Sequence, residues 1–434
     1  MKRRARHWRR CQGSATRPPW TNRSAWPRSR HCSRVSTKPG SEGGAAASAP
    51  LRVLHLHSTF DAGGKERRAV ALMNAFAKGG HGASNGKAIR HSIVSAVPEA
   101  TGARAAIDPA VTVGFPFGFP PLTGKFSVDR MRKLARAMQD FDLVLTYNWG
   151  AMDAAMAHAM FAPSMRLPPL VHHEDGFNAD EAGKLSWRRN WYRTVALARA
   201  SRLVVPSERL EAIALTAWRQ PRGKVVRIAN GIDTAAFTAK PGPKAIPRVV
   251  KRADEIWIGT VAGLRAVKAL PRMVEAFSGL DDRFQLVILG EGPERQAIVE
   301  KAIDLNIGHR VHLPGFVADP AGAIGLFDIF ALSSDSEQFP LSVVEAMAAG
   351  LPVASPAVGD VALMVSPENL PYIVAPGDAG ALGAAMQELG DSAALRTKIG
   401  EANRAKARAD YDAGPMVARY AQLYAGVLGR PSFP

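Results

Sequence analysis

From Leu51 onward the chain alternates short runs of aliphatic and β-branched residues with longer, Ala-rich amphipathic stretches. The short runs have the length and composition of buried strands, and the longer stretches have the spacing of helices that cover a sheet. Strands that alternate regularly with helices form βαβ units, whose strands are parallel. The sequence therefore predicts an α/β protein built on doubly wound parallel sheets.

The alternation is interrupted once, at Lys240–Arg252, where Pro, Lys and Arg dominate and no periodicity is present. Such a segment is typical of a connection between domains. A chain of 434 residues is also too long for one hydrophobic core. We therefore expect two Rossmann-like domains facing each other across a cleft, at 51–239 and 255–410, joined by 240–254 and followed by a helical segment at 411–434.

The expected elements follow this division. In the first domain we expect strands at Arg52–His57, Arg90–Val94, Asp142–Thr146, Leu170–His172, Arg202–Val205 and Val225–Ile228, and helices including Lys65–Lys78, Val128–Gln139 and Trp187–Ala200. In the second we expect strands at Ile256–Val261, Phe284–Leu289, Val311–Leu313, Asp328–Leu332 and Pro352–Ala354, and helices at Leu270–Ser278, Pro293–Leu305 and Leu341–Ala349. Ligands of such sheets bind at the carboxyl ends of the strands, so the loops that follow strands are the places to look for chemistry.

Residues 1–50 differ from the rest in composition. They hold twelve Lys and Arg residues against the single acid Glu42, and so supply most of the net charge of +18. No continuous apolar segment of a secretory signal is present, and we expect a disordered, solvated or non-native extension. A nucleic-acid-binding or lipid-binding arm is the alternative. Both cysteines, Cys11 and Cys32, lie here, so the remainder can form no disulfide, as expected of a cytoplasmic protein.

The remainder of the chain is only mildly basic. This charge is compatible with phosphate-bearing ligands or an anionic surface, and it does not require nucleic acid as a partner. The sequence also contains no run of about 18 apolar residues, so no membrane-spanning helix is predicted.

The most informative loop follows the expected strand Asp328–Leu332. It carries Glu337, then Pro340 at an expected first helical position, and the helix that follows contains Glu345. The unpaired backbone N–H groups at the start of this helix, together with the helix dipole, favour a bound phosphate. The residues expected to form this phosphate cradle are Phe339, Pro340, Leu341 and Ser342. The two carboxylates can accept hydrogen bonds from hydroxyl groups on either side of the phosphate.

These residues resemble the Glu-x7-Glu element of family-4 glycosyltransferases, and the resemblance extends over about residues 51–430. It implies the GT-B fold, a nucleotide-sugar donor and retention of anomeric configuration. It also implies that Glu337 holds hydroxyls of the donor sugar, that Glu345 holds the ribose, and that the last helix crosses back to the first domain. The simpler alternative is that both glutamates are solvated charges at a helix start.

A second loop, Ile258–Lys268, follows the first expected strand of the second domain. Cations here can clamp a diphosphate and stabilise the charge that develops as the glycosidic bond breaks. Lys268 resembles the family's lysine. The family's arginine falls on Gly263, which leaves Arg265, two positions later, as the expected substitute. The alternative is a merely solvated pair of cations.

Two further loops of the second domain resemble donor contacts of the family. Gly290, Glu291 and Gly292 form a turn that is either a donor contact or only a tight turn before a helix. Phe316 and Val317 match the position where relatives contact the base through backbone atoms.

In the first domain, Gly63 and Gly64 form a glycine turn between a strand and a helix, where the backbone can approach a ligand closely. The resemblance implies that they border the donor phosphates or the acceptor. A purely structural turn is the alternative. A histidine near the reacting sugar is implied after the strand beginning at Leu170, and we assign that role to His172, with His173 as the fallback. A metal site with the following acids is a third possibility, although no other ligands are spaced to complete it.

Three other motifs have expected roles outside catalysis. Asn230–Asp233 matches a turn of the family that closes the first domain, and we expect it to be architectural. Asp140–Asp142 imitates a metal-binding Asp-x-Asp motif but precedes its strand, so we expect no metal there. The helix Trp187–Arg193, with Lys184 and Arg199 nearby, can lie on an anionic membrane or receive a lipid-linked acceptor. Alternatively it packs its aromatic rings into the fold and solvates its arginines.

The resemblance therefore predicts a metal-independent, retaining glycosyltransferase with no cofactor besides its nucleotide-sugar co-substrate. The expected catalytic residues are His172, Arg265, Lys268 and Glu337. A saccharide or lipid-linked acceptor is expected, in cell-surface polysaccharide or glycolipid assembly, in the cytoplasm or at the inner face of the membrane. A nucleotide-sugar 2-epimerase of the same fold and a non-catalytic membrane or nucleic-acid adaptor are the alternatives.

Overall fold

The computed structural model describes residues 49–61, 63–79, 88–177, 181 and 185–434. The expectations for the N-terminal extension, including those for Cys11 and Cys32, and for Lys184 lie outside the described residues.

The first sheet has seven parallel strands in the order β3-β2-β1-β4-β5-β6-β7. The chain moves outward from β1 to β3 and then continues on the other side of β1, which is the topology of a doubly wound sheet. The switch point therefore lies between β1 and β4. The strands are β1 Leu51–His57, β2 Ile89–Ser95, β3 Thr112–Gly114, β4 Leu143–Tyr147, β5 Leu170–His173, β6 Arg202–Val205 and β7 Val225–Arg227.

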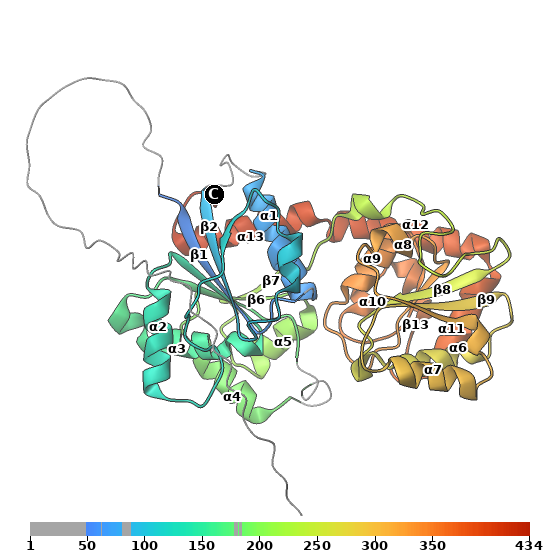
Figure 1. Cartoon of the computed structure of the whole chain (residues 1–434), viewed down its shortest axis with the longest axis horizontal. Helices are drawn as coiled ribbons and strands as arrows, with labels where there is room; N and C mark the ends of the chain where they lie inside the picture. Colours follow the sequence, from blue (N-terminus) through green and yellow to red (C-terminus); the bar gives the residue numbers. More distant parts are fainter. Residues whose placement is uncertain (1–48, 62, 80–87, 178–180, 182–184) are drawn as a thin grey trace, which may run out of the picture. The chain divides into compact units, whose positions relative to one another are not determined.

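Helices cover both faces of this sheet (Figure 1). On one face, α1 and the C-terminal α13 pack against β1, with Tyr420 and Tyr424 of α13 buried beside Val53. On the other face, α2, α3, α4 and α5 form a second buried cluster with β4 and β5. The helices are α1 Gly64–Ala77, α2 Val128–Met138, α3 Met152–Met165, α4 Trp187–Ala196, α5 Glu208–Thr216 and α13 Ala413–Leu428.

The second sheet has six parallel strands in the order β10-β9-β8-β11-β12-β13. Its topology repeats that of the first sheet, with the switch point between β8 and β11. The strands are β8 Ile256–Val261, β9 Phe284–Leu289, β10 Val311–Gly315, β11 Ile329–Ala331, β12 Val353–Pro356 and β13 Ile373–Val374.

The helices of the second domain also form two layers. One buried cluster joins α8, α9 and α10 to the sheet, and another joins α6, α7 and α11 to the opposite face. The helices are α6 Leu270–Ser278, α7 Arg295–Asp304, α8 Ala321–Ile324, α9 Leu341–Ala349, α10 Val361–Met364, α11 Ala379–Asp391 and α12 Ala393–Asp410. Short 3-10 turns connect several elements: η1 Gly102–Ala106, η2 Trp149–Ala151, η4 Thr234–Phe237, η5 Ala266–Lys268, η6 Gly308–Arg310 and η7 Pro367–Tyr372.

The prediction of two doubly wound parallel sheets is confirmed, but several details differ. The edge strands β3 and β13 were not predicted, because they are only three and two residues long and, unlike the equally short β11, none of their residues is fully buried. The prediction that Pro340 is the first helical residue is wrong: its ψ of 107° is extended, and it caps a helix that begins at Leu341. The helix α4 also ends at Ala196 rather than Ala200.

The Asn230–Asp233 turn joins the first domain to the segment between α12 and α13. Ile232 donates its N–H to the carbonyl of Tyr411 at 3.0 Å and accepts the N–H of Ala413 at 2.8 Å. A Cβ on Gly231 would lie 2.8 Å from the carbonyl oxygen of Asp412, so only glycine fits without a shift. The turn therefore has a structural role.

Candidate active site

Three loops at the carboxyl edge of the second sheet are hydrogen-bonded to one another. They follow β8, β9 and β11 and contain most of the motifs singled out in the sequence. Leu264 donates its N–H to the carbonyl of Glu291 at 2.9 Å, and the Ser333 hydroxyl donates to the carbonyl of Lys268 at 2.8 Å. The parallel sheet thus brings together residues far apart in the chain.

The turn Gly290–Gly292 supports the loop that carries the cations. Both glycines have left-handed φ angles, 146° and 156°. A Cβ would lie 1.9 Å from the carbonyl oxygen of Ala262 at the first and 2.4 Å from that of Leu264 at the second. The glycines therefore permit a backbone-to-backbone contact, while the exposed Glu291 side chain pairs with Arg295 at 3.2 Å. The two glycines therefore have a structural role, and a donor contact at this turn stays a prediction.

Lys268 and Glu337 form an ion pair at the centre of these loops. The Lys268 Nζ lies 2.5 Å from Glu337 Oε1, and the Ser334 hydroxyl donates to the same oxygen at 2.8 Å. Both side chains are mostly buried. An ammonium group next to a carboxylate, at the edge of a sheet where ligands bind, can contact a phosphate with one partner and sugar hydroxyls with the other.

Arg265 is exposed beside Gly263. Its Nε lies 3.6 Å from the position that a Cβ on Gly263 would occupy. The guanidinium group of Arg265 therefore lies next to the space into which a side chain at position 263 would project. That Arg265 substitutes for an arginine at position 263 stays a prediction.

The start of α9 lies after the same loop as Glu337. Its first N–H groups have no partners within the helix, as at any helix start, and they can bind an anion. Leu341 and Ser342 are half-buried there, and Phe339 packs edge-to-face on Tyr411 with ring centroids 5.5 Å apart. One Leu341 methyl carbon lies 3.6 Å from where a Cβ on Gly64 would lie, so the starts of α1 and α9 are neighbours.

Glu345 lies in the second turn of α9 and is only 8% exposed. Burial raises the pKa of its carboxyl group to about 7, and the charge of Arg67 opposes this rise. A carboxyl group with such a pKa is partly protonated at neutral pH. Perturbed groups of this kind concentrate at functional sites.

The loop after β10 begins with an exposed aromatic ring. Phe316 is exposed, whereas Val317 is half-buried and packs on the core cluster of the second domain. The Gly315 that precedes them has a left-handed φ of 104° and accepts the N–H of Gly290 at 2.9 Å. This contact holds the loop beside the other three.

In the first domain, the glycine turn caps α1. Gly63 is the N-cap and Gly64 the first helical residue. A Cβ on Gly63 would lie 2.6 Å from Glu66 Oε2, so a larger residue would displace that carboxylate. Glu66 accepts a hydrogen bond from the Thr59 hydroxyl at 3.1 Å and forms an ion pair with Lys65.

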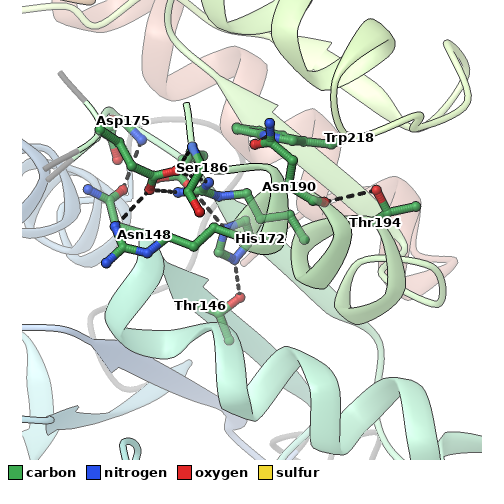
Figure 2. Close-up of polar contacts among 12 residues, drawn as sticks. Thr146, Asn148, His172, Asp175, Ser186, Asn190, Thr194 and Trp218 are labelled. Atoms are coloured by element: carbon green, nitrogen blue, oxygen red, sulfur yellow. Dashed lines mark hydrogen bonds and ion pairs between the residues drawn. The ribbon is translucent and has the colours of Figure 1, made fainter. Parts of the chain in front are cut away.

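His172 is fully buried, and Figure 2 shows its contact with Thr146. Its Nδ1 lies 2.8 Å from the Thr146 hydroxyl, and its Nε2 lies 3.7 Å from Glu174 Oε2. His173 points to the other face of the sheet, where its Nε2 lies 3.0 Å from the Tyr424 hydroxyl. Burial holds the pKa of His173 well below its ordinary value. Neither ring has access to solvent at the end of the strand.

Asp175 is a half-buried acid two residues after β5 that was not predicted as a site residue. Asp175 forms an ion pair with Arg68, which also donates to Asn230 at 2.9 Å. The side chain of Asn148 accepts the N–H of Asp175 at 2.9 Å (Figure 2). Asn148 has a φ of 54°, which is rare outside glycine and marks a strained backbone. The signal in the sequence was the position of these residues directly after strands.

The alternative that the rings of α4 pack inward and its arginines are solvated holds for Tyr192 and Arg188 and is wrong for Trp187, Trp191 and Arg193. Trp187 and Trp191 are exposed. Arg193 is fully buried, and its guanidinium carbon lies 4.9 Å from the centre of the Trp149 ring. Its two terminal nitrogens donate hydrogen bonds to the two carboxylate oxygens of Glu181. Arg193 therefore lies inside the fold, whereas Arg188 and the two indole rings lie outside it.

Two features bear on metal and membrane binding. Asp142 precedes β4 and pairs with Arg52 at 2.9 Å, on the edge of the sheet opposite to the candidate site. Within the described residues, no three His, Cys, Asp or Glu side chains are grouped as ligands of a metal ion. In the same part of the chain, no helix is both long enough and apolar enough to cross a bilayer.

Comparisons with known proteins identify the class. Residues 62–236 match the family model described as "Glycosyltransferase Family 4", and residues 243–406 match "Glycosyl transferases group 1". The crystal structure of Anabaena HepE in complex with UDP superposes with a TM-score of 0.71 at 17% identity, over 87% of this chain and 100% of that one. The chain thus has the GT-B fold, and each of its two domains matches a glycosyltransferase family model.

Curated relatives match over shorter regions. N-acetyl-alpha-D-glucosaminyl L-malate synthase of Bacillus anthracis is 29% identical over 39% of this chain and 45% of its own length. GDP-mannose-dependent alpha-mannosyltransferase of Mycolicibacterium smegmatis is 30% identical over 50% of this chain and 55% of its own length. The chain therefore spans about half the length of these relatives.

Proposed function

We propose that this protein is a retaining glycosyltransferase that transfers a sugar from a nucleotide-diphosphate sugar to a saccharide or lipid-linked acceptor. The observation that carries the proposal is the Lys268–Glu337 ion pair at 2.5 Å, on a loop that leads directly into the start of α9. Glycosyltransferase family matches over both domains support it, as do the names of relatives that act in polysaccharide or glycoconjugate assembly.

In the proposed complex, the diphosphate of the donor lies against the start of α9, with Lys268 and Arg265 contacting its oxygens. These cations and the helix start stabilise the charge on the departing diphosphate, so no metal ion is needed for that step. Glu337 accepts hydrogen bonds from hydroxyls of the donor sugar and Glu345 from the ribose. Phe316 and Val317 border the base.

The transfer itself is proposed to occur on one face of the sugar. The bond between the anomeric carbon and the phosphate oxygen breaks as the bond to the acceptor oxygen forms. The acceptor's proton passes to the departing phosphate oxygen. His172 is buried in this structure, so its proposed part is to fix the end of β5 through its contact with Thr146 rather than to touch the sugar. Asp175 and Asn148 border the proposed acceptor side.

A thermal-shift screen of the full chain against UDP-, GDP- and ADP-sugars tests the proposal. A donor at a hundredfold excess over its Kd adds about 2.7 kcal/mol to the free energy of unfolding, and so raises the Tm. UDP-glucose is the first candidate, because the solved HepE structures include a complex with it. The proposal fails if no donor raises the Tm, or if the Lys268→Ala variant shows the same shift.

A transfer assay with the donor found in that screen completes the test. Product with the donor's anomeric configuration, formed in the presence of EDTA, supports retention without a metal. An epimerised nucleotide sugar in the absence of acceptor would instead assign the chain to the 2-epimerases.

The position of Arg265 beside Gly263 predicts that an arginine at position 263 restores the transfer rate lost with Arg265. Arg265→Ala is expected to lower the transfer rate by about tenfold or more, because one cation at the departing phosphate is lost. Adding Gly263→Arg to that variant is expected to recover most of the rate, since a side chain there projects toward the same space and Gly263 is not in the left-handed region. Initial rates at saturating donor measure both effects.

The control for this rescue is Gly279→Arg in the Arg265→Ala background. Gly279 also has open space around it and an ordinary φ of −79°, but it lies at the end of α6. Recovery by this control as well would show that any added positive charge restores the rate, and would contradict the assignment of Arg265.

A further inference from the structure

Among the described residues of the first domain, the exposed Phe and Trp side chains fall in two segments only. Phe117, which is fully exposed, and Phe126 (58%) lie in residues 115–127, after β3. Trp187 (73%) and Trp191 (63%) lie on α4. Both segments follow the carboxyl ends of strands, at the edge where the acceptor is proposed to enter. Large aromatic rings in these positions suggest a contact with an apolar phase.

The rings on α4 form a stripe. Trp187, Trp191 and Val195 are spaced by four residues, so they lie on one face of the helix, and all three are exposed. The opposite face is anchored by the buried Arg193, which makes hydrogen bonds of 3.1 and 3.0 Å with Glu181. The stripe is therefore presented on a helix that is fixed to the fold.

One carboxylate ties the two segments together. Asp153, at the start of α3, accepts a hydrogen bond from the Tyr192 hydroxyl of α4 at 2.6 Å and pairs with Arg130 of α2 at 2.5 Å. Arg130 in turn donates to the carbonyls of Gly124 and Lys125 at 3.0 and 3.1 Å. The helices α2 and α4 both pack on α3 (Figure 1). The two segments that carry the exposed rings are thus held together through Asp153 and α3.

The exposed charges of the two segments have one sign. Arg189 and Arg193 of α4 pair with Glu181, which leaves Arg188 exposed on α4 and Lys125 exposed in residues 115–127, and neither segment contains an acid. Arg188 is exposed beside Trp187, with its guanidinium carbon 5.5 Å from the ring centre. Indole rings next to basic side chains are the residues that prefer the headgroup region of an anionic bilayer.

We propose that Phe117, Phe126, Trp187 and Trp191 form one docking surface for an anionic lipid bilayer, held together by Asp153. A bilayer fits better than a second copy of this chain, because the rings protrude from two segments and basic side chains accompany them. A bilayer can admit separate rings at different depths. The proposal concerns the partner of the first domain and does not depend on sugar transfer.

Co-sedimentation of the full chain with lipid vesicles tests this surface. The wild-type chain is expected to bind vesicles of phosphatidylcholine mixed with phosphatidylglycerol more tightly than vesicles of phosphatidylcholine alone. The double variant Trp187→Ser/Trp191→Ser is expected to lose about tenfold or more of its partition coefficient for the mixed vesicles, since each indole ring loses its burial. Arg188→Glu is expected to weaken binding to the mixed vesicles only.

The matched control is Ile303→Ser/Leu363→Ser, which removes two exposed apolar side chains from the second domain. It is expected to bind like the wild type. The proposal is overturned if the tryptophan variant keeps the wild-type partition coefficient, or if the control loses as much. It is also overturned if the tryptophan variant differs only by losing self-association in light scattering, since the surface would then bind a second copy.

These outcomes are independent of the proposed function. Vesicle binding is measured without donor or acceptor, and the tryptophan variant should keep any donor-dependent rise in Tm. Loss of vesicle binding with an intact thermal shift concerns only the docking surface. Absence of a thermal shift with intact vesicle binding concerns only sugar transfer.

Discussion

Replacing Lys268 with alanine is expected to lower the rate of sugar transfer by about two to three orders of magnitude, the usual effect of removing a group that stabilises transition-state charge. In the proposed complex the Lys268 ammonium group contacts the diphosphate as it departs. The loss should therefore fall mainly on kcat, which initial rates at saturating donor measure directly. The fold should also lose a few kcal/mol of stability, because the mostly buried Glu337 loses its cation and keeps only the hydrogen bond from Ser334.

A second ion pair in the same domain supplies a matched control. Lys251 lies 2.5 Å from Asp328, and both side chains are buried to a degree similar to Lys268 and Glu337. Lys251→Ala removes a lysine from an equivalent pair away from the three loops, so its transfer rate should stay near that of the wild type. Equal losses in the two variants would mean that Lys268 acts through stability alone.

Replacing Glu345 with glutamine is expected to weaken donor binding by about tenfold or more while stabilising the fold at alkaline pH. In the proposed complex its ionised carboxylate accepts hydrogen bonds from two ribose hydroxyls, and bonds to a charged group are worth about 1.5–3 kcal/mol each. A glutamine offers only one acceptor oxygen and places an amide donor against the other hydroxyl. Titration calorimetry with the nucleoside diphosphate measures this loss.

The stability change follows from the raised pKa of Glu345, about 7 against an ordinary value of 4.5. The folded state binds this proton more tightly than the unfolded state, so the wild type loses stability as the pH rises from 4.5 to 7. Glutamine has no such penalty. The variant should therefore gain up to about 3 kcal/mol over the wild type above pH 7, with no gain from this source below pH 4.5. Urea denaturation at acidic and alkaline pH measures this difference.

Glu300→Gln is the control, because Glu300 lies on the exposed face of α7 and only accepts a hydrogen bond from Gln296 at 2.9 Å. Neither its donor affinity nor its stability should change appreciably with pH. If the Glu345 variant is no more stable than the wild type at alkaline pH, the carboxyl group is not buried as described. If its affinity for the nucleoside diphosphate is unchanged, the proposed ribose contact is wrong.

Much of the fold follows from local patterns. Alternation of aliphatic runs with amphipathic stretches predicted both parallel sheets, because each strand and helix must bury its own apolar face. The main strands, such as Ile256–Val261 and Phe284–Leu289, were found to the residue. The strands β3 and β13 were missed, because such short segments are held by pairing with a neighbouring strand rather than by their own composition.

The same patterns predicted which loops meet in the second domain. Lys268 and Glu337 are 69 positions apart, yet the parallel topology places the ends of β8 and β11 side by side. Residues after the strands of one parallel sheet share an edge, so their proximity could be predicted without coordinates. Their exposure and mutual contact could not be predicted.

The tertiary structure decided which charged and aromatic side chains are buried. The sequence of α4 alone favoured inward rings and solvated arginines, but Arg193 is buried among Trp149, Phe177 and Trp218, which come from other segments, while Trp187 lies outside. His172 is enclosed in the same way by neighbouring elements. The sequence by itself determined the parallel sheets and the loops that carry chemistry, because periodicity and strand order are local or topological properties. Only the tertiary structure decided which charged and aromatic groups reach solvent, because burial depends on side chains that are distant in the chain.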